Sequence, residues 1–358
     1  MNGRVTRLGL ALLVAGATAM GGAALLSRSW PLQASSPSPT RGAELFSTTF
    51  KPEQGLGPLF NETSCVSCHN SPSAGGSGAE GLSTVLRVGQ LTTGQFDPMI
   101  GKGGPVARAH SIAELGVSCP LAPGIPAGAN VTSVRNTPPL FGDGLINAIP
   151  DAVISAGAVA RGGGIQGRPN FVNRRVGRFG WKADTPSLEQ FVGEAFRNEL
   201  GLTNPIAPLD LVPPGVCGGG QSSTKIDAGA VSDVVAYIDS LPAPQPGGGD
   251  STVFDRIGCG ACHVSNLGGV PLYSDLLLHN MGSALDDGVI QASAAGQDWR
   301  TTPLWGLSRR VRFLHDGRAR SLDAAIKAHA GEAAAVVERY QSLTAEERTG
   351  LLLFLATL

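Results

Sequence analysis

The sequence predicts a mainly α protein whose two halves are homologous and whose helices are joined by long irregular loops. Glycine and proline supply 50 and 25 of the 358 residues, a share that is typical of irregular connections. Apolar residues recur at helical spacing after Ser187 and again after Ser321. A series of short motifs also occurs once in each half, in the same order. The first observation predicts the loops, the second predicts helices and the third predicts the duplication.

The composition excludes two functional classes. Of all residues, 42% are hydrophobic and 15% are charged, and the formal net charge is −1. A chain of this length and apolar content can bury a core and has room for about two domains. Its charge is too balanced for a polybasic nucleic-acid binder and too low for a disordered acidic chain. We therefore expect a folded protein that binds no nucleic acid.

The N-terminal residues resemble a targeting segment. Arg4 and Arg7 precede an almost uncharged apolar run over residues 8–26, and a polar stretch follows at residues 35–40. A basic start before an apolar run is typical of a secretory signal peptide. We assign residues 1–34 to a signal peptide and spacer, and we expect cleavage. The run is also long enough for an uncleaved membrane anchor, which is the alternative.

Four of the six cysteines occur in two motifs, Cys65-Val-Ser-Cys68-His69 and Cys259-Gly-Ala-Cys262-His263. C-x-x-C-H is the attachment pattern of c-type haem, in which two thiols bond to the haem vinyl groups and the histidine binds iron. A zinc site would need the two pairs to converge on one ion, and a thioredoxin-like pair needs no following histidine. We therefore predict two covalently bound haems c, which agrees with the secretory segment because haem c is attached outside the cytoplasm.

The other two cysteines, Cys119 and Cys217, lie in stretches rich in proline and glycine. In an oxidising compartment, a remaining pair of cysteines most simply forms a disulfide. We therefore expect a bond between these two residues.

The halves also match outside the cysteine motifs. Residues 135–138 (Arg-Asn-Thr-Pro) have a counterpart at residues 300–303 (Arg-Thr-Thr-Pro), and residues 179–189 align without gaps to residues 313–323. Trp181 then takes the place of His315. We predict an N-terminal haem domain over residues 41–245 and a C-terminal haem domain over residues 246–358. The proline- and glycine-rich run at residues 242–249 is the natural linker.

A helix is predicted after the aligned serine of each half. Ser187 is a good N-cap, Gln190 lies at position N3 of a capping box, and Gly201 offers a stop. The second copy runs from Ser321 to His329. We expect the two helices to occupy equivalent places over their haems.

The second axial position of each iron decides what the haem does. A strong ligand there makes an electron-transfer haem, whereas an empty position can bind peroxide or dioxygen. His329 lies seven residues after Leu322, about −20° around the helix, but its ungapped equivalent in the first half is Ala195, which cannot bind iron. We predict that the C-terminal haem is ligated by His263 and His329 and that the N-terminal haem keeps an open position. Two alternatives are that Met281 is the ligand and that His329 only bonds to a neighbour.

Glu199 is a candidate for acid–base chemistry. It lies eleven residues after Leu188, about 20° from the same direction, on the apolar face of the first helix. The macrodipole disfavours a carboxylate near a helix C-terminus, and burial would raise its pKa, so that it could shuttle a proton between the two oxygens of peroxide. The alternative is a last-turn glutamate that leans into solvent. Gln190 could point into the same pocket, Trp181 could relay electrons or only pack, and His110 could cap the N-terminal haem in a resting state.

Six segments together resemble the di-haem oxidoreductase family: Gly55-Leu-Gly-Pro-Leu-Phe-Asn61, Gly177-Arg-Phe-Gly-Trp-Lys-Ala183, Glu199-Leu-Gly-Leu-Thr-Asn204, Tyr273-Ser-Asp-Leu-Leu-Leu-His279, Trp299-Arg-Thr-Thr-Pro-Leu-Trp-Gly306 and Leu314-His-Asp-Gly-Arg-Ala-Arg320. The resemblance covers residues 41–358. That family is similar in turn to bacterial di-haem cytochrome c peroxidases, methylamine dehydrogenase maturation enzymes and rubber-cleaving di-haem oxygenases. The resemblance implies mostly helical, cytochrome c-like domains with one catalytic haem and one electron-relay haem.

The resemblance also implies roles for single residues. His329 falls at the distal ligand of the second haem, Glu199 near the peroxidatic acid, Gln190 near a companion glutamine and Trp181 at the inter-haem tryptophan. A Ca²⁺ site between the haems would map to three oxygen ligands of the kind that calcium requires, from Asn136, Thr301 and the carbonyl group of Pro303.

Together these observations favour a peroxidase-like di-haem c oxidoreductase, secreted through its signal peptide into the periplasm of a Gram-negative bacterium. Electrons from a small donor protein, a cytochrome c or a cupredoxin, would enter through the C-terminal haem and reach peroxide or dioxygen at the N-terminal haem. Contact with a membrane is expected only if the N-terminal segment is uncleaved. One alternative is a di-haem oxygenase or protein-maturation enzyme, and the other is a plain electron-transfer cytochrome in which both irons are six-coordinate.

Overall fold

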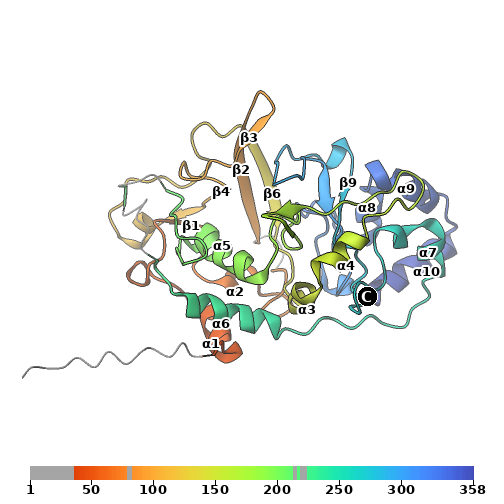
Figure 1. Cartoon of the computed structure of the whole chain (residues 1–358), viewed down its shortest axis with the longest axis horizontal. Coiled ribbons are helices and arrows are strands. Elements are labelled where there is room, and N and C mark those ends of the chain that lie inside the picture. Colours follow the sequence, from red (N-terminus) through yellow and green to blue (C-terminus); the bar gives the residue numbers. More distant parts are fainter. Residues whose placement is uncertain (1–35, 79–82, 213–215, 218–223) are drawn as a thin grey trace, which may run out of the picture. The chain divides into compact units, whose positions relative to one another are not determined.

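Figure 1 shows the computed structural model of the chain, which describes residues 36–78, 83–212, 216–217 and 224–358. The predicted signal peptide and spacer, residues 1–34, lie outside the described residues. Residues Ser36–Leu358 form one unit, and the domain boundary that we predict near residue 245 stays a prediction. Among the described residues, we find no helix with the length and apolar character needed to cross a membrane.

Short helices alternate with long loops along the described chain. The α-helices are α1 (Pro39–Ser47), α2 (Cys65–Cys68), α3 (Asp143–Ala148), α4 (Asp151–Ala156), α5 (Leu188–Leu200), α6 (Ala228–Asp239), α7 (Thr252–Ile257), α8 (Leu322–Lys327), α9 (Ala334–Gln341) and α10 (Ala345–Ala356). The 3₁₀-helices are η1 (Pro52–Gln54), η2 (Ile112–Leu115), η3 (Cys259–Ala261), η4 (Ser283–Leu285), η5 (Leu307–Arg309) and η6 (Gly331–Ala333). Several begin at a serine, aspartate or threonine whose side chain accepts a backbone amide of the first turn, which compensates for the missing helical partner there.

The strands form several small antiparallel sheets. The largest places β2 (Thr84–Thr92) beside β3 (Gln95–Asp97), β4 (Val106–Ala107) and β6 (Val131–Asn136). Two-stranded pairs join β1 (Leu59–Phe60) to β5 (His110–Ser111), β7 (Phe171–Val172) to β8 (Arg175–Val176), and β9 (Leu278–Asn280) to β10 (Asp298–Arg300). A two-residue turn with positive φ at Thr93 (49°) and Gly94 (81°) connects β2 to β3, as tight hairpins require.

The expected fold class, mainly α with two cytochrome c-like haem domains, is wrong. Helices account for 33% of the residues and strands for 15%, spread over several small sheets. The physical reason lies in β2, which is rich in the β-branched residues valine and threonine and pairs with three other strands. The prediction of long irregular loops agrees with the helix order of Figure 1, in which an extended stretch joins α6 to α7.

The duplication extends to the backbone. Phe179 bridges to Thr185 in the first half, and the aligned Phe313 bridges to Ala319 in the second half. Positive φ angles also coincide, at Gly180 (78°) with Leu314 (68°) and at Ala183 (49°) with Gly317 (72°). Ser187 and Ser321 then cap α5 and α8 with nearly the same φ and ψ. The internal repeat that we predict from the sequence is therefore a repeat of conformation.

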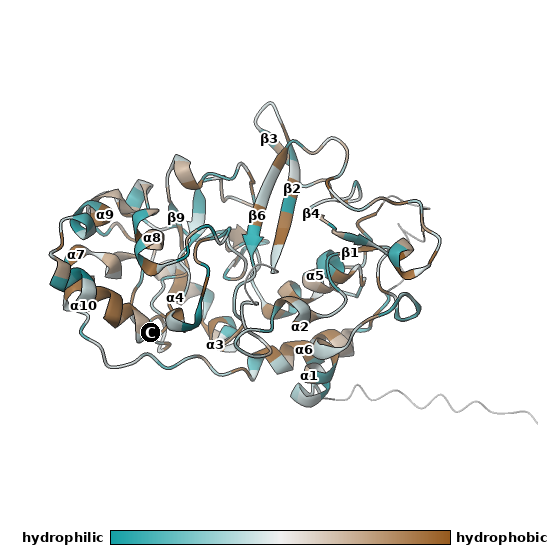
Figure 2. Cartoon of the chain, turned by 180° about the vertical axis from the view of Figure 1, so that it is seen from behind, coloured by the Kyte–Doolittle hydropathy of each residue, from teal (hydrophilic) through white to brown (hydrophobic). Residues whose placement is uncertain are grey.

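The buried apolar residues form two main clusters. One contains residues of α1, α3, α5 and α6 together with Leu272, Leu276, Leu277 and Trp305 from the second half of the chain. The other joins α7, α9 and α10, and the apolar end of α10 is visible in Figure 2. The first cluster thus draws on both halves of the sequence.

Backbone hydrogen bonds also tie the halves together. The amide of Asn136 donates to the carbonyl oxygen of His315 at 2.6 Å, and the amide of Arg300 donates to the carbonyl oxygen of Trp181 at 2.9 Å. Lys182 is fully buried, and its Nζ donates to the carbonyl oxygens of residues 295, 296 and 298. The same Nζ lies 3.2 Å from Oδ1 of Asp287 and 4.1 Å from the centre of an indole ring, that of Trp299.

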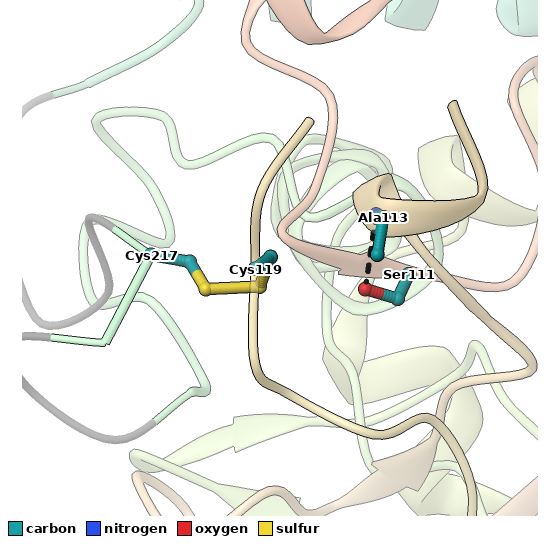
Figure 3. Close-up of a disulfide and its surroundings, with 4 residues drawn as sticks. All are labelled: Ser111, Ala113, Cys119 and Cys217. Carbon is teal, nitrogen blue, oxygen red and sulfur yellow. Dashed lines mark hydrogen bonds between the residues drawn. A yellow bond between two sulfur atoms is a disulfide. The ribbon is translucent and has the colours of Figure 1, made fainter. Parts of the chain in front are cut away.

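The expected disulfide is present in the structure. Cys119 and Cys217 are bonded. Their Cα atoms lie 5.5 Å apart, and their positions in the sequence differ by 98. Figure 3 shows the bond close to Ser111, whose side chain accepts the amide of Ala113 at 3.3 Å. The prediction that these two cysteines pair is confirmed.

Candidate active site

The first Cys-x-x-Cys-His motif lies on the short helix α2. Ser64 caps this helix, because its hydroxyl accepts the amide of Ser67 at 3.2 Å, and His69 follows the last turn. Cys65 and Cys68 are not bonded to each other, and burial raises the pKa of each thiol to about 12. A thioredoxin-like pair needs the opposite shift, so this interpretation is disfavoured. Among the described residues, we find no cluster of three or more histidine, cysteine, aspartate or glutamate side chains that could hold a metal ion.

Both motif histidines are held in one tautomer. Nδ1 of His69 donates to the carbonyl oxygen of Gly76 at 3.1 Å, and Nδ1 of His263 donates to the carbonyl oxygen of Tyr273 at 2.9 Å. Burial lowers the pKa of each ring to about 4, so both rings are neutral at neutral pH. With the proton on Nδ1, Nε2 keeps its lone pair, which is the arrangement that a proximal iron ligand needs.

Residues of α2 and α5 line a cavity of about 220 Å³, which we call the first cavity. Cys65, Cys68 and His69 contribute to it, and so does Ala195. His69 is the only histidine among the described residues that line this cavity, and no methionine is among them. The described wall therefore offers one strong iron ligand and no second one.

The helix that carries Ala195 has the bounds that the sequence predicts. Ser187 accepts the amide of Gln190 at 3.3 Å, and Gly201 ends α5 with a left-handed φ of 67°. The predicted capping box is not formed in this helix, because Nε2 of Gln190 donates to Oε1 of Glu194 at 2.8 Å. Gln190 is not one of the described residues that line the first cavity, but Glu194 is.

Glu199 lines the first cavity from the last turn of α5. Nδ2 of Asn61 donates to Oε2 of Glu199 at 2.7 Å, and the amide of Asn61 donates to the carbonyl oxygen of Glu199, also at 2.7 Å. Burial raises the pKa of Glu199, and the bond from Asn61 and the positive charges of Arg108 and Arg87 oppose this shift. The carboxyl group therefore holds a proton at higher pH than an exposed glutamate does.

Trp181 also lines the first cavity, and its Nε1 donates to the carbonyl oxygen of Asn136 at 2.9 Å. Its counterpart in the repeat, His315, is buried and stacks on Trp299, with ring centres 3.7 Å apart and an interplanar angle of 9°. Electron relay and packing both stay open as interpretations of Trp181.

The second motif forms η3 and continues through Cys262 to His263. Cys259 and Cys262 are unbonded and contact the second apolar cluster. His329 lies two residues beyond the end of α8, so the predicted helix is shorter than expected. The chain turns instead at Gly331 (φ 55°). Nδ1 of His329 donates to the carbonyl oxygen of Ala325 at 2.7 Å. Burial is the main cause of the lowered pKa of His263, and the rings of His329 and His279 are close enough to lower it further by their charges.

Two other histidines are engaged elsewhere. The side chain of His110 is 45% exposed, its Nδ1 lies 2.8 Å from Oε2 of Glu114, and it is not among the described residues of the first cavity. His279 lies between two carboxylates, with Glu332 2.7 Å from Nδ1 and Asp275 3.1 Å from Nε2. Burial works against the charged ring, but the bonds to Asp275 and Cys262 outweigh it and raise the pKa of His279 to about 11.

Comparisons with known proteins agree with this geometry. The family described as "Di-haem oxidoreductase, putative peroxidase" matches residues 129–269 and 259–358, more than half of the chain. The chain belongs to this family. No curated protein matches the di-haem oxidoreductase sequence. The solved structure of Kuenenia stuttgartiensis hydrazine synthase pressurized with 20 bar xenon aligns over 98% of this chain and 100% of that chain, with 15% identity and a TM-score of 0.42. A similarity at this level carries no argument.

The residues of the di-haem oxidoreductase fit haem at both motifs. Each motif combines unbonded thiols with a neutral histidine whose Nδ1 is already occupied, and the first adjoins a cavity with an apolar helix face. These are the features that covalent attachment and axial ligation require.

The three residues of the predicted calcium site fit a cation less well than the two motifs fit haem. The carbonyl oxygen of Pro303 accepts the guanidinium of Arg310 at 3.2 Å, so a cation there would face a positive charge. Oγ1 of Thr301 lies 3.5 Å from the carbonyl oxygen of Leu277, and the carbonyl oxygen of Asn136 accepts the indole of Trp181.

Sequence reasoning missed several residues of the first cavity. Asn61, Arg87, Asp184 and Glu194 all line it. Arg87 lies on β2, where its alternation with Val85 predicts that both residues share one face, and Val85 lines the cavity too. Asn61 gives no such signal, because its partner Glu199 is 138 residues away.

Proposed function

We propose that this di-haem oxidoreductase is a periplasmic c-type peroxidase that reduces hydrogen peroxide at the haem of the first motif. One observation carries the proposal: the first cavity combines His69 with a carboxyl group of raised pKa, and its described wall has no second histidine or methionine. The second motif differs, because the ring of His329 is close enough to His263 to influence its pKa. This asymmetry supports an open iron at the first motif and a closed iron at the second.

Haem bound at His69 supplies an iron that accepts electrons and transfers them to peroxide. The chain supplies the protons and the environment. Reduction of one hydrogen peroxide to two waters takes two electrons and two protons. Burial raises the pKa of two acids that line the first cavity, Glu194 and Glu199, and we assign to Glu199 the role of holding and returning one of the protons. Asn61 fixes the direction of its carboxyl group, since Oδ1 of Asn61 is itself held by the amide of Ala109 at 2.9 Å. Burial raises the pKa of Glu199, which favours its protonated form and so its action as a general acid.

The electrons come from outside the protein in this proposal. A small cytochrome c or cupredoxin would deliver them to the haem of the second motif, which His263 and His329 would hold for electron transfer. The covalent attachment of both haems through Cys65, Cys68, Cys259 and Cys262 agrees with secretion, for which the N-terminal residues are the support.

Exchange of Glu199 tests the proposal. Glu199→Gln should lower turnover with hydrogen peroxide by about 10²-fold or more, because the general acid is lost, while both haems stay bound. Glu189→Gln is the matched control, since Glu189 lies on the exposed side of the same helix. Equal turnover of wild type and Glu199→Gln would remove this residue from the mechanism.

Spectroscopy tests the iron assignments independently of turnover. The reduced protein should contain one high-spin haem that binds carbon monoxide and one low-spin haem that does not. Two inert low-spin haems would show an electron carrier instead of an enzyme. His329→Ala should convert the second haem to high spin, and an unchanged spectrum would move the ligand to Met281. Turnover with dioxygen and an organic or protein substrate, but not with peroxide, would favour an oxygenase or a maturation enzyme.

A further inference from the structure

A second cavity, of about 470 Å³, adjoins the first cavity. Pro138, Gly180 and Phe191 line both of them. Much of the remaining wall is aromatic or proline, including Phe179 and Trp305. A cavity of this size and character accommodates the apolar body of an organic molecule.

Two arginines in this second cavity have donors without acceptors. Nη1 of Arg300 and Nε of Arg310 are buried and have no hydrogen-bond partner among the described residues. The two guanidinium groups also repel each other, since burial and then the charge of Arg300 lower the pKa of Arg310 to about 10. A buried donor without an acceptor costs free energy, and two neighbouring cations add to that cost. An anion bound in the second cavity would remove both penalties.

The acidic residue of the second cavity does not supply that anion. Asp143 lines the cavity, and the charge of Arg300 acts on its carboxyl group. Burial raises its pKa to about 7, and the charge of Arg300 only partly opposes this shift. The charges of Asp143 and Asp184 raise the pKa of Arg300, but Asp143 is only partly ionised at neutral pH and balances the two cations incompletely.

We propose that the second cavity binds the carboxylate of an organic group, which Arg300 and Arg310 hold by charge-assisted hydrogen bonds while the aromatic wall covers the apolar body. Guanidinium groups suit this task because their planar donors match a carboxylate. The carboxylate belongs either to a free organic acid or to a propionate of the haem in the adjoining first cavity. In both cases the site lies outside the peroxide chemistry and does not depend on it.

Calorimetric titration of the intact di-haem protein with benzoate tests the first source. Benzoate should bind, benzamide should not, and Arg300→Gln and Arg310→Gln should each weaken benzoate binding about 10- to 100-fold, the usual effect of losing one charge-assisted bond. Arg174→Gln is the matched control, since Arg174 is exposed and lies outside the described wall of the cavity. Arg300→Lys should restore part of the affinity because it keeps the charge.

Redox titration of the same proteins tests the second source. If a propionate fills the site, benzoate does not bind, and Arg300→Gln and Arg310→Gln lower the midpoint potential of one haem because a positive charge beside it is lost. Arg174→Gln leaves that potential unchanged. The proposal is overturned if benzoate affinity and both midpoint potentials are the same in wild type and in the Arg300 and Arg310 variants. Arg310→Gln keeps the test decisive if Arg300→Gln fails to fold, because the side-chain bonds of Arg310 reach only nearby carbonyl groups.

Discussion

Removal of the disulfide should cost several kcal/mol of unfolding free energy. The bond joins residues 98 apart in sequence, and the segment between them contains β6, α3, α4 and α5 with Glu199. In the chain-entropy description, closing a loop of this length takes about 16 cal/mol/K from the unfolded state, which is about 4.7 kcal/mol at 25 °C. The change therefore acts on the segment that carries the candidate active site, without touching a cysteine of either haem motif.

The double variant Cys119→Ala/Cys217→Ala can be compared with wild type by denaturation in guanidinium chloride. We expect its midpoint to fall by about 1 M, given an m-value of about 4 kcal/mol/M for a chain of this size. Haem content should stay the same. Wild type treated with a mild reductant serves as a control, because it should show the same shift with every side chain in place. A midpoint equal to that of wild type would refute the argument from loop closure.

Three further predictions concern single residues. Asn61→Ala should raise the pKa of Glu199 further, since the bond from Asn61 opposes the effect of burial. The alkaline limb of the pH profile of peroxide turnover, where Glu199 loses its proton, should therefore move to higher pH; an unmoved limb would show that Asn61 does not set this pKa. Lys182→Met leaves the buried carboxylate of Asp287 with Arg135 as its remaining cation and takes the donor from three buried carbonyl oxygens, so it should lower the unfolding free energy by about 1–3 kcal/mol in a urea titration. Lys102→Met at an exposed pair should have little effect. Gly201→Ala should lower the unfolding free energy by about 1–3 kcal/mol, because φ is 67° at this position and a Cβ atom would lie 2.7 Å from the carbonyl oxygen of Gly57. An unchanged melting curve would contradict this prediction.

The features that the sequence predicts correctly depend on neighbours in sequence. The bounds of α5 follow from Ser187 and Gly201, which act on the helix directly beside them. The duplicated turns follow from an ungapped alignment, because homologous segments of equal length keep the same backbone conformation. The disulfide follows from the number of cysteines, because four of the six belong to the two Cys-x-x-Cys-His motifs and the remaining two pair with each other.

The features that it does not predict depend on contacts between distant segments. The sheet around β2 forms because strands far apart in sequence supply its partners, although the Thr93-Gly94 turn is a local signal for its first hairpin. The side chain of Gln190 bonds to Glu194 because an acceptor one helical turn away competes with the capping position. The bond between Asn61 and Glu199 needs the folded chain, so no local pattern indicates it.

The mutual dependence of the two halves limits how this protein can be divided. A fragment that stopped at the linker would lose Leu272, Leu276 and Leu277 from the cluster beneath α5, and the amide of Asn136 would lose its acceptor. Neither piece could be grafted onto another scaffold or exchanged with a relative as a self-sufficient module. The ancestral duplication has in this way become irreversible, since each copy now completes the interior of the other.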